Sequence, residues 1–405
     1  MQIAIVGGGI GGLSLALSLH QAGIACRVYE AAPELKPLGV GINLLPHAMR
    51  ELTELGLGAA LERVAVATRE VVFCNRFGQF IRREPRGRAA GYPWPQLSIH
   101  RADLHQVLAA AMGDALVLGA KCAAIEQDAE GVILRFENGG SARADAAIGC
   151  DGIHSAVRRI LHPAEGPLSY EGINMWRGVT RAMPFLTGAS MVVGGWLEGG
   201  KLVVYPVRNA IDGEGRQLIN WVAEIQSPRN VMQGWNRPGR LEDFLPAFAG
   251  WTFGWLDCAA LLRDAESVLE YPMVDREPLP CWTRGRVTLL GDAAHPMYPR
   301  GSNGAGQAIL DARALAGCLR RERDVPAALA AYEAARLASA YEVVLANRAS
   351  GPDALLAEVH RRTGDRPFGR IEDVMSEAEM LALAENYQRI AGFEREALER
   401  RASLA

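Results

Sequence analysis

The stretch IAIVGGGIGGLSLALSLHQAGIACRVYE, residues 3–30, decides the fold of this chain. Residues 3–6 are apolar and partly β-branched, as in a strand buried on both faces, and the glycine-rich segment 7–12 follows with no spacer. Leucines and alanines then recur at helical spacing until Gly23, and residues 25–29 again have the character of a strand. This order of strand, glycine-rich turn, helix and strand predicts a βαβ unit of the Rossmann type.

The glycines have the spacing of a pyrophosphate-binding turn. Gly7 permits the tight turn, Gly9 lets the backbone approach a phosphate, and Gly12 lets the helix pack closely on the strand. Ile10 and Gly11 lie where the helix begins, and its free N–H groups attract an anion. Because strand, glycines and helix occur together, the sequence predicts a dinucleotide site rather than a purely structural turn.

An acidic residue follows the second strand of this unit. Glu30 is placed to accept hydrogen bonds from the ribose hydroxyls of an adenosine. Its negative charge would repel a 2′-phosphate, so the predicted site suits FAD or NAD rather than NADP.

Composition and charge exclude several classes of protein. A net charge of −3 over 405 residues argues against a nucleic-acid partner, which needs a basic face. No apolar run approaches the roughly 20 residues that cross a bilayer, and the N-terminus lacks the basic start of a signal peptide, so we expect a cytoplasmic protein without a membrane span. The histidines have no zinc-type spacing and the cysteines form no Cys-x-x-Cys pair, so we expect no metal.

The pattern of apolar, aromatic and turn-forming residues changes along the chain and predicts an α/β fold with an insertion. Residues 1–167 form the first part of the nucleotide-binding domain, with a small β excursion near 69–97. Residues 168–280 hold six of the eight tryptophans in β-prone runs and predict an inserted, mostly antiparallel substrate domain. Residues 281–350 return to the nucleotide-binding domain, and residues 351–405 form a helical C-terminal region.

Two further turns combine glycine and aspartate at predicted strand ends. They are Asp151-Gly152 and Gly291-Asp292. Ligands of open α/β sheets lie outside the carboxyl ends of the strands, so these turns and the first glycine motif can meet around one extended ligand.

The three turns together resemble the signatures of a known family. GGGIGG at 7–12, CDGIHSAVR at 150–158 and GDAAHPMYPRGSNGAGQAILDA at 291–312 are similar to the motifs of the single-component FAD-dependent aromatic hydroxylases related to p-hydroxybenzoate hydroxylase and salicylate hydroxylase. The resemblance covers about residues 1–350.

Within this family the chain resembles the phenazine hydroxylases that form pyocyanin from 5-methylphenazine-1-carboxylate. The shared stretches are PLGVGIN (37–43), GINMWRGVT (172–180) and YPMVDREPLP (271–280). The third motif has Ser302-Asn303-Gly304 where many members of the family have a different glycine loop.

The resemblance implies tightly bound FAD. Glu30 would hold the adenosine ribose, Arg101 would reach the pyrophosphate or ribityl region, and Asp292 would accept a hydrogen bond from a ribityl hydroxyl. Asp151 is linked in the family to both FAD and NAD(P)H, with Arg158 nearby, and its alternative role is a turn or helix cap. The remaining cofactor-binding residues are loop residues near the isoalloxazine: Gly41, Gly304 and Ala305.

The chemistry that the resemblance implies needs little from side chains. NAD(P)H reduces the flavin, O2 adds at C4a, and the hydroperoxyflavin hydroxylates an aromatic or heteroaromatic ring in a water-excluding pocket. No catalytic acid or base is assigned, and His295 is interpreted as a structural hydrogen-bonding residue. The candidate pocket residues are Trp176, Arg177, Tyr205, Trp221, Met273 and Pro299. Arg177 would pair with a substrate carboxylate or form a structural ion pair, and the others would be pocket walls or plain core.

Several alternatives stay open at this point. The favoured substrate resembles a phenazine carboxylate, and the alternatives are a monocyclic phenolic acid or a quinolone. The sequence allows NADH or NADPH, a monomer or a homodimer, and hydroxylation, decarboxylative hydroxylation or N-oxidation. A non-enzymatic flavin-fold binding protein is the alternative from another class, although such a protein would have no use for the intact Asp292 turn.

Overall fold

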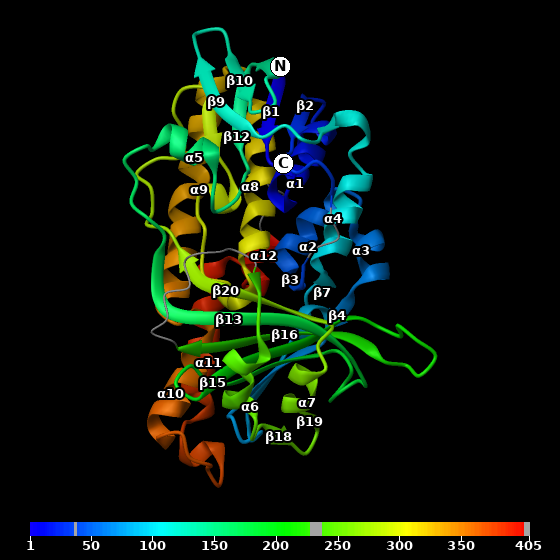
Figure 1. The fold of residues 1–405 in the computed structure, drawn as a ribbon. Helices are drawn as coiled ribbons and strands as arrows, with labels where there is room; N and C mark the ends of the chain where they lie inside the picture. The colour runs from blue at the N-terminus through cyan, green and yellow to red at the C-terminus, as the bar shows by residue number, and fades with distance from the viewer. Residues whose placement is uncertain (36–38, 227–236, 401–405) are drawn as a thin grey trace.

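Two large β-sheets, three small ones and the helices around them form the structure, a computed structural model that describes residues 1–35, 39–226 and 237–400 (Figure 1). The first sheet has five strands in the order β21-β12-β1-β2-β8, and all of its pairs are parallel. Its strands are β1 (Gln2–Val6), β2 (Ala25–Tyr29), β8 (Leu116–Val117), β12 (Ala146–Gly149) and β21 (Val287–Leu289). This sheet confirms the predicted Rossmann-type architecture.

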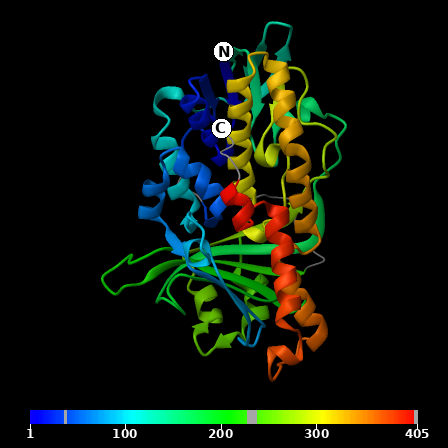
Figure 2. The same cartoon turned by 180° about the vertical axis from the view of Figure 1, so that it is seen from behind.

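Helices bury one face of the parallel sheet and a small sheet within residues 122–144 packs on the other, because the central strands are apolar on both sides. Ile3 and Ile5 of β1 are fully buried. Helix α1 (Ile10–Gln21) packs against α8 (Gly304–Arg321), and α8 lies beside α9 (Val325–Arg348), as Figure 2 shows in yellow and orange. The first and last parts of this domain, about 290 residues apart in the chain, therefore share one core.

The second sheet has eight strands in the order β17-β20-β13-β16-β15-β14-β5-β6 and lies across the lower half of Figure 1. The inserted segment supplies β13 (Ser169–Ala182), β14 (Ser190–Trp196), β15 (Gly200–Arg208), β16 (Gln217–Gln226), β17 (Arg237–Pro238) and β20 (Ser267–Asp275). Their pairs are antiparallel, which confirms the mostly antiparallel insertion. Helices α6 (Leu245–Phe248) and α7 (Cys258–Arg263) and an aromatic cluster cover one face of this sheet.

The stretch near 69–97 differs in one respect from the sequence expectation of a local β excursion. Strands β5 (Glu70–Cys74) and β6 (Phe80–Pro85) extend the large sheet, because β5 pairs in parallel with β14. Strands β3 (Gly41–Leu44), β4 (Val66–Thr68) and β7 (Gln96–His100) form a separate three-stranded sheet. Pairing between strands more than a hundred residues apart leaves no local pattern in the sequence, and the domain limits themselves stay a prediction.

The remaining elements complete the outer layers. They are α2 (Pro46–Glu54), α3 (Gly58–Val64), α4 (Arg101–Ala110), α5 (Ala156–Leu161), a sheet of β9 (Cys122–Gln127), β10 (Val132–Phe136) and β11 (Ser141–Ala144), a hairpin of β18 (Thr252–Phe253) and β19 (Leu256–Asp257), and the C-terminal helices α10 (Ala354–Thr363), α11 (Glu377–Ala391) and α12 (Arg395–Arg400). The C-terminal region is helical as predicted, and Figure 2 shows its red end returning to the middle of the molecule. None of the helices in the described ranges has the length and apolar content needed to span a membrane.

Candidate active site

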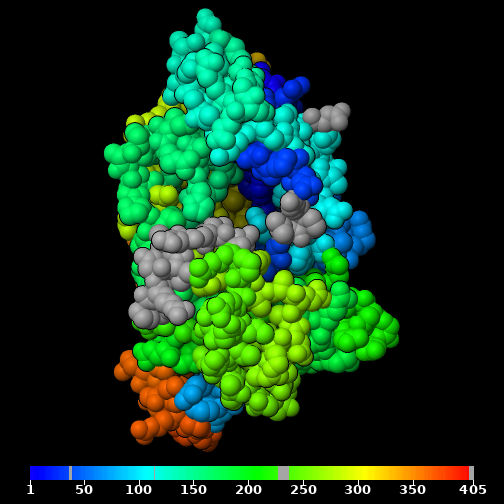
Figure 3. Space-filling view, viewed as in Figure 1, coloured from blue at the N-terminus to red at the C-terminus, as the bar shows by residue number. Residues whose placement is uncertain are grey.

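A cavity of about 420 Å³ lies between the parallel sheet and the large sheet. Its walls come from the turn after β1, the segment around Gly41, the loop before α8, the face of the large sheet opposite α6 and α7, and the C-terminal helices. Figure 3 shows the surface hollowed between the blue N-terminal part and the green segments. All three motifs of the sequence reach this cavity, at Gly9, Cys150 and Asp292.

Some glycines of the first motif allow close backbone packing, and others line the cavity. Gly9, Ile10 and Gly11 line the cavity, and a Cβ atom on Gly9 would meet nothing within 4 Å. Gly7 has a φ of +105°, and a Cβ there would lie 2.5 Å from the carbonyl oxygen of Cys150. A Cβ on Gly12 would overlap the carbonyl oxygen of Gly7. Gly7 and Gly12 therefore allow close packing, while Gly9 leaves open space in front of the α1 N-terminus.

Glu30 lies at the end of β2, beside the glycine turn. Its Oε2 accepts the Gly8 N–H at 2.6 Å and its Oε1 accepts the Ala32 N–H at 2.8 Å. Glu30 is not among the residues that line the cavity. Its carboxylate holds the turn in this structure.

The second motif forms a helix cap. The Asp151 carboxylate accepts the hydroxyl of Ser155 and the Ala156 N–H, the latter at 2.6 Å. Burial raises the pKa of the Asp151 carboxyl, although these hydrogen bonds act in the opposite direction. The side chain thus caps α5, the alternative that the sequence left open, and the neighbours Cys150 and Gly152 line the cavity in its place.

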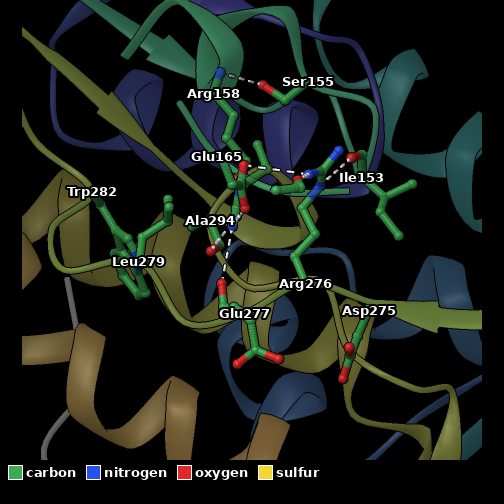
Figure 4. A network of polar contacts seen from close by, with 12 residues as sticks. Ile153, Ser155, Arg158, Glu165, Asp275, Arg276, Glu277, Leu279, Trp282 and Ala294 are labelled. Carbon is green, nitrogen blue, oxygen red and sulfur yellow. Dashed lines mark hydrogen bonds and ion pairs between the residues drawn. The ribbon is translucent and has the colours of Figure 1, made fainter. Parts of the chain in front are cut away.

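Arg158 lies behind the cavity rather than in it. Its guanidinium is 1% exposed and donates to the carbonyl oxygens of Ala293 at 2.9 Å and Ala294 at 2.8 Å. It also forms a bidentate pair with Glu165, which Arg276 approaches at 3.4 Å (Figure 4). Arg158 therefore supports the turn that carries Asp292 and does not reach a ligand in the cavity.

The third motif brings Asp292 to the cavity wall. Its side chain opens onto the cavity, and no described residue donates a hydrogen bond to its carboxylate. Burial within the protein raises the pKa of the Asp292 carboxyl, while His295 and Arg101 act to lower it. Gly304 and Ala305, at the start of α8, line the cavity beside it.

A buried polar network holds the third motif from behind. Asp311 accepts the Gly291 N–H at 3.1 Å, lies 2.6 Å from His295 Nε2, and accepts from Arg336 Nε at 2.7 Å. Burial opposes ionisation of Asp311, but His295 and Arg336 outweigh it and lower the pKa of its carboxyl to about 2. His295 therefore has the structural hydrogen-bonding role that the sequence indicated.

The segment around Gly41 joins the two halves of the site. The Gly41 N–H donates to Asn220 Oδ1 at 2.6 Å, and Arg177 Nη2 donates to the Gly41 carbonyl at 2.8 Å. A Cβ on Gly41 would lie 2.6 Å from the Cβ of Asn220 and 2.8 Å from the Tyr205 ring, so only glycine allows this approach. Arg101, whose backbone N–H donates to the Val40 carbonyl at 3.0 Å, lines the cavity next to this segment. Pro37 and Leu38 of the shared stretch lie outside the described residues.

The structure separates the candidate pocket residues into two groups. Arg177, Tyr205 and Pro299 line the cavity, whereas Trp176, Trp221 and Met273 do not. Successive residues of a strand point to opposite faces, so Trp176 and Trp221 lie on the covered face of the large sheet. Their rings lie 5.3 and 5.6 Å from the ring of Phe244. Met273 is fully buried in a small core with Tyr298, so these three side chains are core, the alternative that the sequence had named.

The same alternation reveals cavity residues that sequence reasoning missed. Lys201 and Val203 precede Tyr205 on the cavity side of β15, and Val222 and Glu224 lie on the same side of β16. Because every second residue of a strand points to the same face, Tyr205 as a predicted pocket residue would have indicated Val203 and Lys201 as well.

No pattern in the sequence indicated that the C-terminal helices also line the cavity. Tyr387 of α11 lines the cavity, accepts from Asn303 Nδ2 at 2.8 Å and donates to Asn347 Oδ1 at 2.8 Å. A tyrosine 84 positions after Asn303 thus fixes the loop that precedes α8.

These features suit one long anionic ligand. The N-termini of α1 and α8 both face the cavity, and each offers free N–H groups and a positive dipole end. The open space at Gly9 admits a phosphate, and the Asp292 carboxylate can accept from ligand hydroxyls. The residues present therefore fit FAD. No group of three or more potential ligands for a metal ion occurs within residues 1–35, 39–226 and 237–400.

Comparisons with known proteins agree with this geometry. A family model described as an FAD binding domain matches residues 1–189 and 272–347. A phenazine 1,6-dicarboxylic acid hydroxylase of Lysobacter antibioticus is 43% identical over 96% of this chain and 97% of its own. A 3-amino-4-hydroxybenzoate 2-monooxygenase of Streptomyces platensis is 38% identical over 97% of this chain and 96% of its own. The solved structure of Klebsiella pneumoniae HpxO with FAD and uric acid has a TM-score of 0.78 and 27% identity, covering 98% of this chain and 97% of that chain.

Proposed function

This chain belongs to the FAD-binding-domain family of aromatic hydroxylases and is an FAD-dependent monooxygenase, and from this premise we propose that it hydroxylates a fused-ring aromatic acid of the phenazine-carboxylate type. The observation that carries the proposal is the cavity itself. It combines an arginine without an acidic partner in the described chain, Arg177, with an apolar floor next to the loop before α8.

We propose specific roles for the residues that hold FAD. The turn at Gly9, Ile10 and Gly11 takes the pyrophosphate, and Arg101 adds a positive charge beside it. Asp292 accepts from a ribityl hydroxyl, since its carboxylate has spare acceptor positions and faces the cavity. Gly41, Gly304 and Ala305 lie where the backbone can approach the isoalloxazine. For Glu30 the ribose role remains a prediction, because its carboxylate also has backbone partners.

The protein groups around the ring system orient the substrate and exclude water. Bound FAD supplies the redox chemistry, taking reducing equivalents from NAD(P)H and activating O2 for transfer of one oxygen atom to the ring. Arg177 lines the cavity and takes the substrate carboxylate, since its Nε has no hydrogen-bond partner among the described residues. Burial raises the pKa of the Tyr205 hydroxyl beside it, so this hydroxyl stays protonated. The N-terminus of α8 stabilises negative charge at its end of the cavity.

The choice of a phenazine-like ring rests on the relative that shares 43% of its residues with this chain and is named for phenazine 1,6-dicarboxylic acid. The apolar side chains of the cavity floor suit a flat, fused ring system: Val71, Phe73, Met191, Val193, Val203 and Val222. A monocyclic acid is the second candidate, because the 38% identical relative is named for 3-amino-4-hydroxybenzoate. A quinolone is the third.

The test is a substrate panel with the FAD-loaded enzyme. Oxidation of NADH and of NADPH is followed with phenazine carboxylates, hydroxybenzoates and quinolones, with oxygen uptake and product mass recorded in parallel. We expect phenazine carboxylates to stimulate oxidation most and to gain one oxygen atom, and product mass distinguishes simple from decarboxylative hydroxylation. Stimulation by a monocyclic acid alone would contradict the phenazine choice while leaving the monooxygenase in place.

We expect NADH or NADPH to act as a transient co-substrate, because the sequence has no second dinucleotide motif. The protein is a monomer or a homodimer, which the mass of the purified enzyme in solution will decide. A cytoplasmic location remains a prediction of the sequence.

A further inference from the structure

A cluster of buried charges lines the cavity on the side away from Gly41. Lys201 Nζ lies 3.1 Å from each oxygen of Glu224 and 2.6 Å from Asp353 Oδ2. Lys201 is 2% exposed, Glu224 3% and Asp353 4%, and all three line the cavity. Arg300 Nε lies 3.7 Å from Asp353, so the cluster carries no net charge.

Stability alone is a weak reason for such a cluster. Apolar residues of similar volume often serve a buried site as well as an ion pair or better, because charges lose hydration on burial. The three side chains also come from β15, β16 and the turn before α10, and they meet only at the cavity wall. A polar group in the ligand gives the cluster a use that packing does not.

The strand register fixes where the cluster lies along the cavity. Tyr205 pairs with Asn220, Val203 with Val222, and Lys201 with Glu224. Each step of two residues advances roughly 7 Å along the strands, so the last pair lies about 14 Å from the first. Asn220 contacts Gly41 and so marks the end where Arg177 also donates. Arg177 itself pairs with Val222, and its guanidinium reaches from there to the Gly41 carbonyl, beside Asn220. A ligand on the apolar Val203–Val222 pair therefore has the Arg177 guanidinium on its Asn220 side and the Lys201 cluster on the opposite side.

The hydrogen-bonding capacity of the cluster selects the group that it accepts. The three N–H groups of a lysine ammonium match the three contacts that Lys201 makes, so its donors are used. Each carboxylate has about four acceptor positions, and most of those on Glu224 and Asp353 remain unused among the described residues. The spare capacity is therefore acceptor capacity. A second carboxylate would bring no hydrogen-bond donor to these acceptors.

From these observations we propose that Glu224, Asp353 and Lys201 form a specificity-determining subsite that accepts a hydrogen-bond donor of the substrate, a hydroxyl, amino or ring N–H group, opposite the carboxylate at Arg177. Glu224 and Asp353 accept the hydrogen bond, and Lys201 holds the two carboxylates together. The inference rests on the proposed function, because it names the second polar end of the same aromatic acid.

Matched ligands test the subsite in the FAD-loaded enzyme. The probes are 6-hydroxyphenazine-1-carboxylate and its 6-methoxy analogue, with 4-hydroxybenzoate and 4-methoxybenzoate as a shorter pair. Dissociation constants come from the change in the flavin absorption spectrum on titration. A hydrogen bond to a charged group predicts that at least one hydroxy ligand binds about tenfold to a hundredfold more tightly than its methoxy partner.

Glu224→Gln should remove this preference, and Asp353→Asn should reduce it. Glu270→Gln is the matched control, because Glu270 is 4% exposed on the same sheet and pairs with Arg237 outside the cavity. We expect it to keep the wild-type preference.

The outcomes separate the inference from the proposed function. Equal binding of hydroxy and methoxy ligands to the wild-type enzyme overturns the subsite but leaves an aromatic-acid site intact. A preference that survives in Glu224→Gln and Asp353→Asn also overturns it. Failure of all four acids to bind overturns both proposals. If a variant does not retain FAD, the wild-type comparison still decides.

Discussion

At the scale of single residues, the site depends on which carboxylates already have partners. Glu30 and Asp151 accept backbone N–H groups of the protein, while the Asp292 carboxylate accepts none from the described residues. The Asp292 side chain is exposed in the cavity, so its carboxylate oxygens stay free to accept hydrogen bonds from a ligand. Asp292 is therefore the acidic residue of the three motifs that a ligand with hydroxyl groups would stabilise most.

Replacing Asp292 with alanine should weaken FAD retention. A charge-assisted hydrogen bond contributes roughly 1.5–3 kcal/mol, so we expect the dissociation constant for FAD to rise about tenfold to a hundredfold. The ratio of flavin to protein absorbance after gel filtration measures it. Asp373→Ala, at an exposed position outside the cavity, is the control. Unchanged flavin content in Asp292→Ala would contradict the ribityl role.

At the scale of elements, the C-terminal helix α11 fixes the loop that precedes α8. Gly301 and Ser302 have positive φ angles of 66° and 58°, so this loop holds a backbone shape that few residues adopt readily. The Tyr387 hydroxyl lies where a Cβ on Gly301 would be, and it bonds both Asn303 and Asn347. Helix α11 therefore holds the loop in place and also forms a wall of the cavity.

Tyr387→Phe should loosen this loop. Asn347 is fully buried, and removal of the hydroxyl leaves its Oδ1 without the Tyr387 donor, which costs about 1–3 kcal/mol. Asn303 Nδ2 keeps its hydrogen bond to the Gly301 carbonyl and loses the one to Tyr387. We expect a lower free energy of unfolding in urea and faster loss of FAD. Leu381→Ala, at a position on α11 that is 41% exposed, is the control. A Tyr387→Phe protein that matches the wild type in both measurements would show that α11 contributes packing alone.

At the scale of the whole molecule, the cavity joins parts of the chain that are otherwise separate cores. The parallel sheet and the large sheet have their own apolar clusters, and the cavity lies between them. A ligand that contacts both sides adds its binding free energy to the folded state of both.

FAD should therefore stabilise the two halves together. At free FAD a hundredfold above its dissociation constant, the folded state gains about 2.7 kcal/mol. We expect calorimetry of flavin-stripped protein to show a lower transition temperature, and added FAD to raise it with a single transition. Flavin mononucleotide, which lacks the adenosine, should raise it less. A transition that FAD leaves unmoved would count against a site between the sheets.

The sequence by itself determined the parallel sheet, the glycine turn and the family. Local patterns carry this information, because a buried strand, a tight turn and a helix start each need particular residues within a few positions of one another. The same patterns gave Asp292, Gly9 and Arg101, whose places at the cavity follow from their positions at the ends of elements.

Only the tertiary structure decided which side chains face the ligand. The large sheet has two buried faces, so Trp176 and Arg177 are equally plausible from the sequence, and the covering helices α6 and α7 settle which of them lines the cavity. Likewise Asp151 became a helix cap, and Lys201, Glu224 and Asp353 met through contacts between residues up to 152 positions apart. Such contacts form because burial brings distant elements together, and that pairing leaves no local trace in the chain.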